Sequence, residues 1–218
     1  MKKLIFTFGL ILLSMSGFAQ NIAVYFEVIP EEHLLQVDPN RRKDMLDLKR
    51  AGREGKVPNK LGGVSELTEL TDTYIRIKVS DNSTLEMKLL PVSGEENIIA
   101  IVKSVCAPAC DSEILFYNTA WQRLPLTDYF NAPLRADFFV TRTEANAAAY
   151  DQALKSVDMD LIQYRFDGET NDLSATYALK DYLPDNIYKE VEPLLKKQGL
   201  TYQWLNNKYL LKDNSQGK

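Results

Sequence analysis

The two cysteines of the chain, Cys106 and Cys110, lie in the segment VCAPACD, and several kinds of chemistry are open to them. A redox pair normally has two residues between its cysteines and sits at a helix N-terminus, whereas Ala-Pro-Ala separates this pair between two strand-like segments. A zinc site needs four sulfur or nitrogen ligands, and the chain has two cysteines and one histidine. We therefore predict a disulfide that pins a turn, because residues facing each other at the ends of paired strands come within reach of an S–S bond. Free thiols, redox chemistry and metal binding are the alternatives.

The only histidine, His33, lies in PEEHLLQ at the start of a short predicted helix. A lone histidine in such a place is typical of a surface or capping residue, and we predict that role for it. No HExxH motif surrounds it. The segment KLGGVSEL has neither a lysine directly after its last glycine nor the glycine spacing of a phosphate-binding loop. We therefore expect no catalytic residue, metal or cofactor. A pair of carboxylates for glycoside hydrolysis stays open as an alternative, because such groups meet only in the fold.

A set of aromatic residues is the other candidate for chemistry. Trp121, Tyr202, Trp204 and Tyr209 could form a platform for a sugar or a peptide, together with Tyr117. Alternating aromatic residues on a hairpin are also typical of packing against a core, and this interpretation is the stronger of the two.

The elements that must position these residues are mostly β-hairpins. The segment YIRIKVSDNSTLEMKLL alternates apolar and charged residues on both sides of a turn, which predicts a hairpin with one buried face and one solvent-exposed face. If Val79 lies opposite Leu85, then Lys78 pairs with Glu86 on the exposed face.

Other segments carry helix and strand signals of the same kind. Together they predict an α+β fold with a mainly antiparallel sheet, built from hairpins and packed by N-terminal, central and C-terminal helices. The expected elements are a helix from Asp38-Pro39 to about Arg50, a hairpin joining 98–102 to 114–117, a helix capped by Thr143, a hairpin within 162–179, a helix over 184–199 interrupted at Pro193, and a last hairpin turning at Asn206-Asn207 with Trp204 opposite Tyr209.

The N-terminus has the features of a cleavable leader. Lys2 and Lys3 precede an apolar run over 4–15, which is shorter than the ~20 residues of a membrane-spanning helix. Gly17-Phe18-Ala19 supplies small residues at a cleavage site. We predict a signal peptide over 1–19 and a periplasmic or secreted protein.

The remainder is of a size for one domain, predicted over 20–211, in which 142–211 could form a second lobe. The polar segment 212–218 is predicted to be a disordered tail. The formal net charge of −4 argues against a nucleic-acid partner, and we expect no transmembrane segment after cleavage of the leader.

Three segments give the chain a family resemblance: LGGVSELTELTDTYIRIKVSDNSTLEMKLLPV, VCAPACDSEILFYNTAWQRL and LTYQWLNNKYLL. In this order they resemble a family of secreted proteins of unknown function from Bacteroidales-type bacteria. The resemblance implies export, one α+β domain and an envelope location, and it implies no activity.

The residues favour a non-catalytic binding or adaptor module of the cell envelope, with a protein, glycan or lipid as partner. The alternative is a carrier or inhibitor that uses a curved sheet to hold a lipid or a partner protein. A carboxylate-based hydrolase is a third hypothesis.

Overall fold

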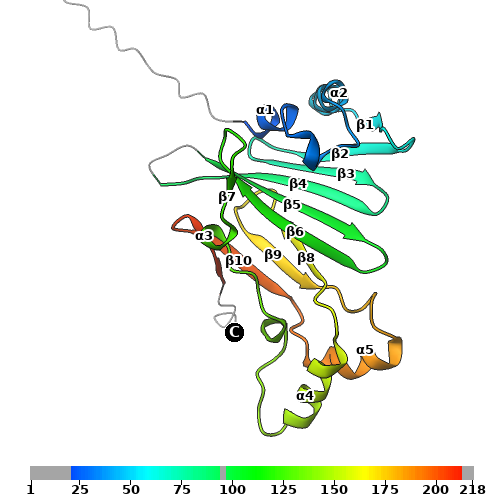
Figure 1. Ribbon diagram of the computed structural model, residues 1–218, viewed down its shortest axis with the longest axis vertical. Helices are drawn as coiled ribbons and strands as arrows, with labels where there is room; N and C mark the ends of the chain where they lie inside the picture. Colours follow the sequence, from blue (N-terminus) through cyan, green and yellow to red (C-terminus); the bar gives the residue numbers. More distant parts are fainter. Residues whose placement is uncertain (1–20, 94–96, 213–218) are drawn as a thin grey trace, which may run out of the picture.

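The computed structural model describes residues 21–93 and 97–212, so the predicted leader and nearly all of the predicted tail lie outside the described residues. Two antiparallel sheets with helices packed around them make up this part of the chain (Figure 1), which confirms the predicted α+β class. The larger sheet contains β1 (Gly55–Pro58), β2 (Val64–Leu70), β3 (Tyr74–Ser80), β4 (Ser83–Leu90), β5 (Ile98–Cys106), β6 (Cys110–Tyr117) and β7 (Arg123–Leu124) in that spatial order.

The smaller sheet has the spatial order β11, β10, β9, β8. Its strands are β8 (Ile162–Phe166), β9 (Leu173–Tyr177), β10 (Leu200–Leu205) and β11 (Lys208–Leu211). The helices are α1 (Ile22–Glu27), α2 (Pro39–Arg50), α3 (Leu126–Tyr129), α4 (Ala147–Ser156) and α5 (Asp185–Val191), with 3₁₀ turns η1 (Glu31–His33), η2 (Arg135–Phe138) and η3 (Glu192–Leu194).

Helix α2 has the boundaries expected from the sequence. Asp38 caps it, because its Oδ1 accepts hydrogen bonds from the amides of Asn40 and Arg41 at 3.0 and 3.2 Å. Met45 and Leu46 are fully buried and belong to the core between the N-terminal helices and one face of the large sheet. No helix within the described ranges combines the length and apolar character that a bilayer span requires.

The central and C-terminal helices are shorter than predicted. Helix α4 begins at Ala147 rather than after Thr143, because the Asn146 side chain accepts a hydrogen bond from the Thr143 amide in the preceding turn. Helix α5 gives way to η3 at Glu192, directly before Pro193, and the helical segment ends at Leu194. Proline cannot donate the hydrogen bond that would continue an α-helix there.

Two predicted hairpins are confirmed residue by residue. Cys106 pairs with Cys110 at the tip of β5 and β6, and Trp204 pairs with Tyr209 in the last hairpin. The turn of the last hairpin places Asn206 at a φ of 51°. Asparagine tolerates this conformation better than most residues.

The predicted register of the β3–β4 hairpin is wrong. The register shifts between Lys78 and Ser80, so Arg76 rather than Lys78 lies opposite Glu86. The face that carries Glu86 is also not exposed, since Glu86 and Lys88 are 2% and 1% exposed. The reason is the smaller sheet, which packs on this face.

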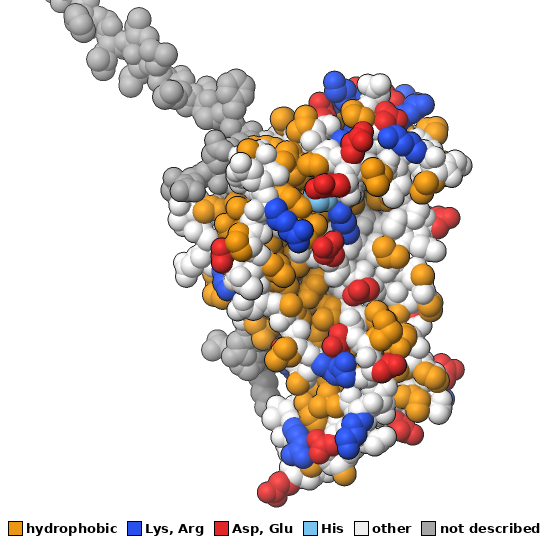
Figure 2. Space-filling model, viewed as in Figure 1, with side chains coloured by type: hydrophobic (Ala, Val, Ile, Leu, Met, Phe, Trp, Pro, Cys, Tyr) orange, Lys and Arg blue, Asp and Glu red, His pale blue; other side chains and the backbone are white. Residues whose placement is uncertain are grey.

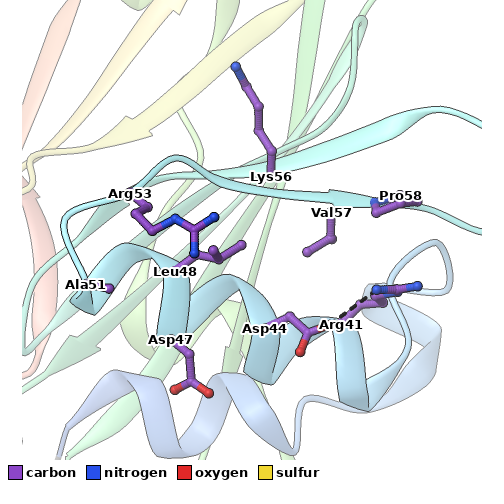
Figure 3. Close-up of a pocket in the computed structure, with 9 residues that line it drawn as sticks. All are labelled: Arg41, Asp44, Asp47, Leu48, Ala51, Arg53, Lys56, Val57 and Pro58. Carbon is purple, nitrogen blue, oxygen red and sulfur yellow. Dashed lines mark hydrogen bonds and ion pairs between the residues drawn. The ribbon is translucent and has the colours of Figure 1, made fainter.

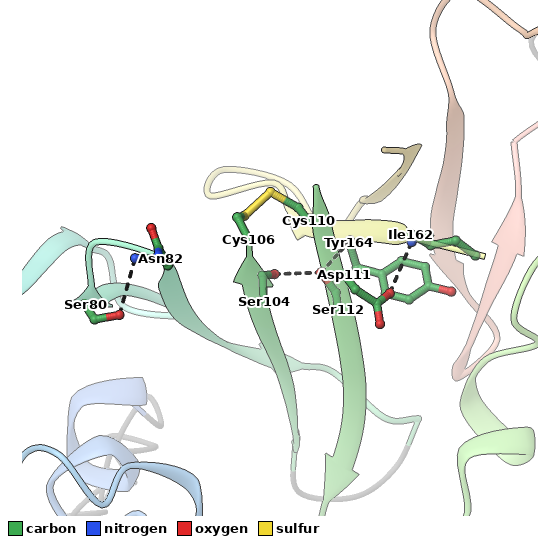
Figure 4. Close-up of a disulfide and its surroundings, with 9 residues drawn as sticks. All are labelled: Ser80, Asn82, Ser104, Cys106, Cys110, Asp111, Ser112, Ile162 and Tyr164. Carbon is green, nitrogen blue, oxygen red and sulfur yellow. Dashed lines mark hydrogen bonds between the residues drawn. A yellow bond between two sulfur atoms is a disulfide. The ribbon is translucent and has the colours of Figure 1, made fainter. Parts of the chain in front are cut away.

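The smaller sheet docks by the free edge of β8, whose outward amides bind side-chain oxygens of the large sheet. The Ile162 amide donates to Asp111 Oδ1 at 3.2 Å, and the Tyr164 amide donates to Ser112 Oγ at 3.1 Å (Figure 4). The Phe166 amide donates to Glu86 Oε2 at 2.9 Å. Polar residues on β4 and β6 therefore satisfy an edge that would otherwise be unpaired.

Lys88 completes this docking surface. Its Nζ donates to the carbonyls of Asp167 and Gly168 at 3.0 and 3.4 Å, directly after β8, and lies 5.5 Å from the centre of the Tyr74 ring. The buried ammonium is thus compensated by two carbonyls and an aromatic face.

Aromatic side chains fill the space between the two sheets. Phe130 meets Tyr164 and Tyr202 edge-to-face, with ring centroids 5.5 and 5.1 Å apart, and Phe166 stacks on Tyr209. These residues form one buried cluster with apolar residues of both sheets, so this interface is a packed core.

On the other side of the large sheet, the buried Arg42 of α2 anchors the segment that carries η1. Its guanidinium donates to the carbonyls of Ile29, Leu34 and Val37 at 2.7, 3.4 and 2.9 Å. These three hydrogen bonds hold the backbone on both sides of η1 and thereby fix the position of His33.

Candidate functional site

The cysteines form a disulfide in the described structure. Their sulfur atoms are 1.98 Å apart at the tip of the β5–β6 hairpin, and Ser104 and Ser112 share a hydrogen bond next to it (Figure 4). The bond closes a tight turn next to Asp111 and Ser112, whose side-chain oxygens accept hydrogen bonds from the amides of β8.

His33 is not the surface or capping residue that the sequence predicts. Its side chain is only 5% exposed, because η1 lays the ring against the large sheet. The ring meets Tyr117 of β6 with centroids 5.0 Å apart, and the Trp121 ring lies 6.2 Å away. Trp121 follows β6 in a turn with a φ of 60°, a strained value for a bulky residue.

Two side chains in this cluster make no hydrogen bond to any described residue. Both ring nitrogens of His33 and Nε1 of Trp121 are buried, and none of them makes a hydrogen bond to another described residue. His33 Nε2 lies 3.5 Å from Oε1 of Glu32, but the Glu32 side chain is 72% exposed and the contact has no hydrogen-bond geometry. Because native proteins pair nearly all buried polar groups, this cluster is a candidate binding site.

A pocket of about 200 Å³ adjoins His33, between η1 and the ends of β4 and β5. Lys103 of β5 lines it and is half-buried, and the burial lowers the pKa of its ammonium. Glu113 lies opposite Lys103 in the register, yet no ion pair joins the two within the described part of the chain. The pocket thus offers a cationic group and a histidine, neither of which has a firm partner among residues 21–93 and 97–212.

The charges around His33 are mixed. Burial, followed by the positive charge of Lys103, lowers its pKa below the usual 6.5, while Glu32 and Glu113 raise it and Arg123 lowers it. Figure 2 shows the histidine as a small pale-blue patch among basic and acidic side chains on this face of the molecule.

The lowered pKa of His33 predicts a pH-dependent stability. The folded state binds the histidine proton less readily than the unfolded chain, so the stabilisation is complete above pH 6.5 and falls as the pH drops through the folded-state pKa. We expect wild-type protein to lose stability from about pH 7.5 to about pH 5.5 relative to His33→Gln, measured by urea unfolding. Groups that titrate in both proteins cancel in this difference, and equal pH slopes for the two proteins would contradict the prediction.

The structure separates the predicted aromatic residues. Trp121 packs with the core under the N-terminal helices, whereas Tyr202 and Tyr209 are buried in the core between the sheets. Trp204 is partly exposed, stacks on Tyr129 and donates from Nε1 to the carbonyl of Pro91 at 2.8 Å. The four residues thus do not form one platform, and a binding role for Trp204 stays a prediction.

A second pocket, of about 350 Å³, lies between α2 and β1 (Figure 3). Two of its basic residues have partners nearby: Arg41 pairs with Asp44 at 3.3 Å, and Lys56 pairs with Glu54 at 2.8 Å. With these charges compensated, it is a weaker candidate than the pocket at His33.

Acidic side chains do converge at one place, where the two sheets meet. Glu86 Oε1 lies 3.3 Å from Arg76 Nε, and Glu69 Oε1 lies 3.5 and 3.2 Å from the guanidinium groups of Arg76 and Arg165. Burial raises the pKa of Glu86 against the opposing effects of the Phe166 amide and Arg76. These acids are engaged in joining the sheets. Elsewhere in residues 21–93 and 97–212, no three His, Cys, Asp or Glu side chains are grouped as a metal site requires.

The sequence and the fold resemble those of known proteins. A family model described as "Protein of unknown function (DUF3256)" matches residues 14–209. The chain belongs to the DUF3256 family. A solved structure of a domain of an uncharacterized protein from Porphyromonas gingivalis W83 is similar to this DUF3256 protein, with 26% sequence identity and a TM-score of 0.76; the match covers 88% of this chain and 98% of that chain. No curated protein matches the chain.

The predicted resemblance is thus confirmed as membership of a family of unknown function. Export of this DUF3256 protein stays a prediction. The sequence contains no local signal that brings His33 and Trp121 together, because they meet only through the packing of η1 on the large sheet.

Proposed function

We propose that this DUF3256 protein is an exported, non-catalytic binding module of the cell envelope, which binds its ligand at the cluster of His33, Trp121 and Lys103. The observation that supports it is the set of buried nitrogens of His33 and Trp121 without hydrogen bonds to described residues. Leaving such groups unpaired costs about 1–3 kcal/mol each, a cost that a ligand with matching groups removes.

The disulfide supports export, since such bonds persist mainly in oxidising compartments. Protein purified from the periplasm or the medium is expected to lack residues 1–19 and to weigh less than its reduced form by the mass of two hydrogen atoms. Intact-mass spectrometry with and without a reductant measures both. Two free thiols in periplasmic protein would count against the proposal.

The competing functions have less support. A lipid carrier needs an open apolar cavity, whereas Phe130, Tyr164 and Tyr202 fill the space between the sheets. A hydrolase needs carboxylates free to act on a substrate, whereas Glu86 and Glu69 are bound to arginines.

Fluorescence of Trp121 tests the binding function. The chain has two tryptophans, so Trp204→Phe leaves Trp121 as the only indole reporter. We expect soluble muropeptides or lipopolysaccharide core oligosaccharides to change its emission in a saturable way, and phospholipid vesicles serve as the lipid probe.

The matched control is Trp121→Phe, which retains only Trp204 and is expected to show no saturable change. If the Trp121 emission does not change with any of the three probes, or if the emission of Trp121→Phe changes equally, the proposed binding site is wrong.

A further inference from the structure

Among the described residues that line the pocket beside His33, Lys103 is basic and Glu32 is acidic. Lys103 brings a half-buried ammonium with no ion pair to a described residue, and the buried His33 ring lines the same pocket. The Gln36 side chain adds a polar group to the lining. A charged donor in a partly dehydrated pocket gains most from an acceptor that is itself charged.

Glu32 shows how an oxyanion can approach. Its carboxylate lies at the rim, with Oε1 3.5 Å from His33 Nε2, and its side chain is 72% exposed and free to move aside. A carboxylate or phosphate oxygen entering the pocket would replace this weak contact with one closer to Lys103. The Glu32 carboxylate thus already places a negative charge beside His33 at the rim of the pocket.

We propose that this pocket binds an oxyanion group of the ligand, a carboxylate or a phosphate, held between the Lys103 ammonium and the His33 imidazole. The inference rests on the proposed binding function and names the chemistry that its ligand presents. A planar carboxylate would come from an acidic sugar or a peptide, and a tetrahedral phosphate from a phosphorylated glycan or a lipid headgroup.

Binding is coupled to the protonation of His33. An anion between His33 and Lys103 favours the protonated ring, so affinity rises as the pH falls toward the histidine pKa. The other charges that act on the ring are Glu32 from η1, Glu113 from β6 and Arg123 from β7. The acids weaken anion binding and Arg123 strengthens it.

The single histidine provides a direct measurement. We expect the Cε1–H signal of His33 in the full chain to shift saturably with inorganic phosphate or acetate at about pH 6, with ionic strength held constant by sodium chloride. Lys103→Met is expected to weaken the affinity about tenfold or more, the loss of one charge-assisted hydrogen bond.

Lys78→Met is the matched control. Lys78 lies on β3, separated from β5 by β4, and lines a different pocket, where its ammonium pairs with Asp81 at 2.8 Å. This variant is expected to bind the anion as the wild type does. Circular dichroism establishes that both variants are folded, and Lys103→Arg, which retains the charge, is expected to restore most of the affinity.

Preference for acetate or for phosphate identifies the kind of ligand group, and either supports the inference. A His33 signal that does not shift, that shifts equally with chloride, or that responds equally in both lysine-to-methionine variants overturns it. If Trp121 responds to an envelope oligosaccharide while His33 is indifferent to both anions, the binding function stands and the oxyanion inference fails. The reverse result leaves an anion site and removes the proposed function.

Discussion

Replacing Glu86 with alanine is expected to lower the free energy of unfolding by about 3–5 kcal/mol, because it leaves buried partners without their acceptor. The Phe166 amide loses its hydrogen bond, and Arg76 loses the carboxylate 3.3 Å from its Nε. The substitution also frees the edge of β8, so the smaller sheet should loosen as a unit. Urea unfolding measures the free energy, and amide hydrogen exchange at β8 measures the loosening.

Glu86→Gln is the matched control, since the amide oxygen can still accept from Phe166, and we expect a smaller loss. Burial raises the pKa of Glu86 above its ordinary 4.5, so the folded state holds this proton more tightly than the unfolded chain. Relative to Glu86→Gln, wild-type stability should therefore fall as the pH rises from 4.5 through the raised pKa. An alanine variant that loses less than about 1 kcal/mol would show that this docking contact is dispensable.

The second large effect is expected at Arg42. Arg42→Ala removes the donors of the carbonyls of Ile29, Leu34 and Val37, and we expect a loss of about 3 kcal/mol or more in the free energy of unfolding. Because these carbonyls flank η1, the His33 ring should also leave its contact with Tyr117. Urea unfolding measures the first effect, and the His33 Cε1–H chemical shift measures the second.

Arg42→Lys separates charge from geometry. A lysine keeps the charge but cannot direct a planar fork at three carbonyls, so most of the loss should persist. Full stability in Arg42→Lys would mean that a single donor is sufficient. An unchanged His33 signal in Arg42→Ala would mean that the arginine does not position the site.

Local signals in the sequence predicted several elements well. Asp38 with a following proline set the start of α2, and Cys106 and Cys110 were placed opposite each other because Ala107-Pro108-Ala109 forms the turn between their two strands. The pairing of Trp204 with Tyr209 followed from counting outward from two asparagines. These features depend on residues that are close together along the chain.

The errors arose where distant segments meet. Glu86 and Lys88 alternate with apolar residues as on a half-exposed strand, and only the docking of β8 makes that face an interior. The site was also missed as a unit, because His33 and Trp121 lie on segments joined only through the large sheet. Trp121 was among the predicted binding aromatics, whereas His33 was predicted to be a surface or capping residue.

The order of strands in the large sheet bears on how the protein assembles. Each strand from β1 to β7 pairs with the next one along the chain, so the sheet is built from contacts of short sequence separation. Such contacts cost little loop-closure entropy, and we expect this half to fold first. The folded large sheet would then present Glu86, Lys88, Asp111 and Ser112 as a template. The strands of the smaller sheet would dock on it through β8.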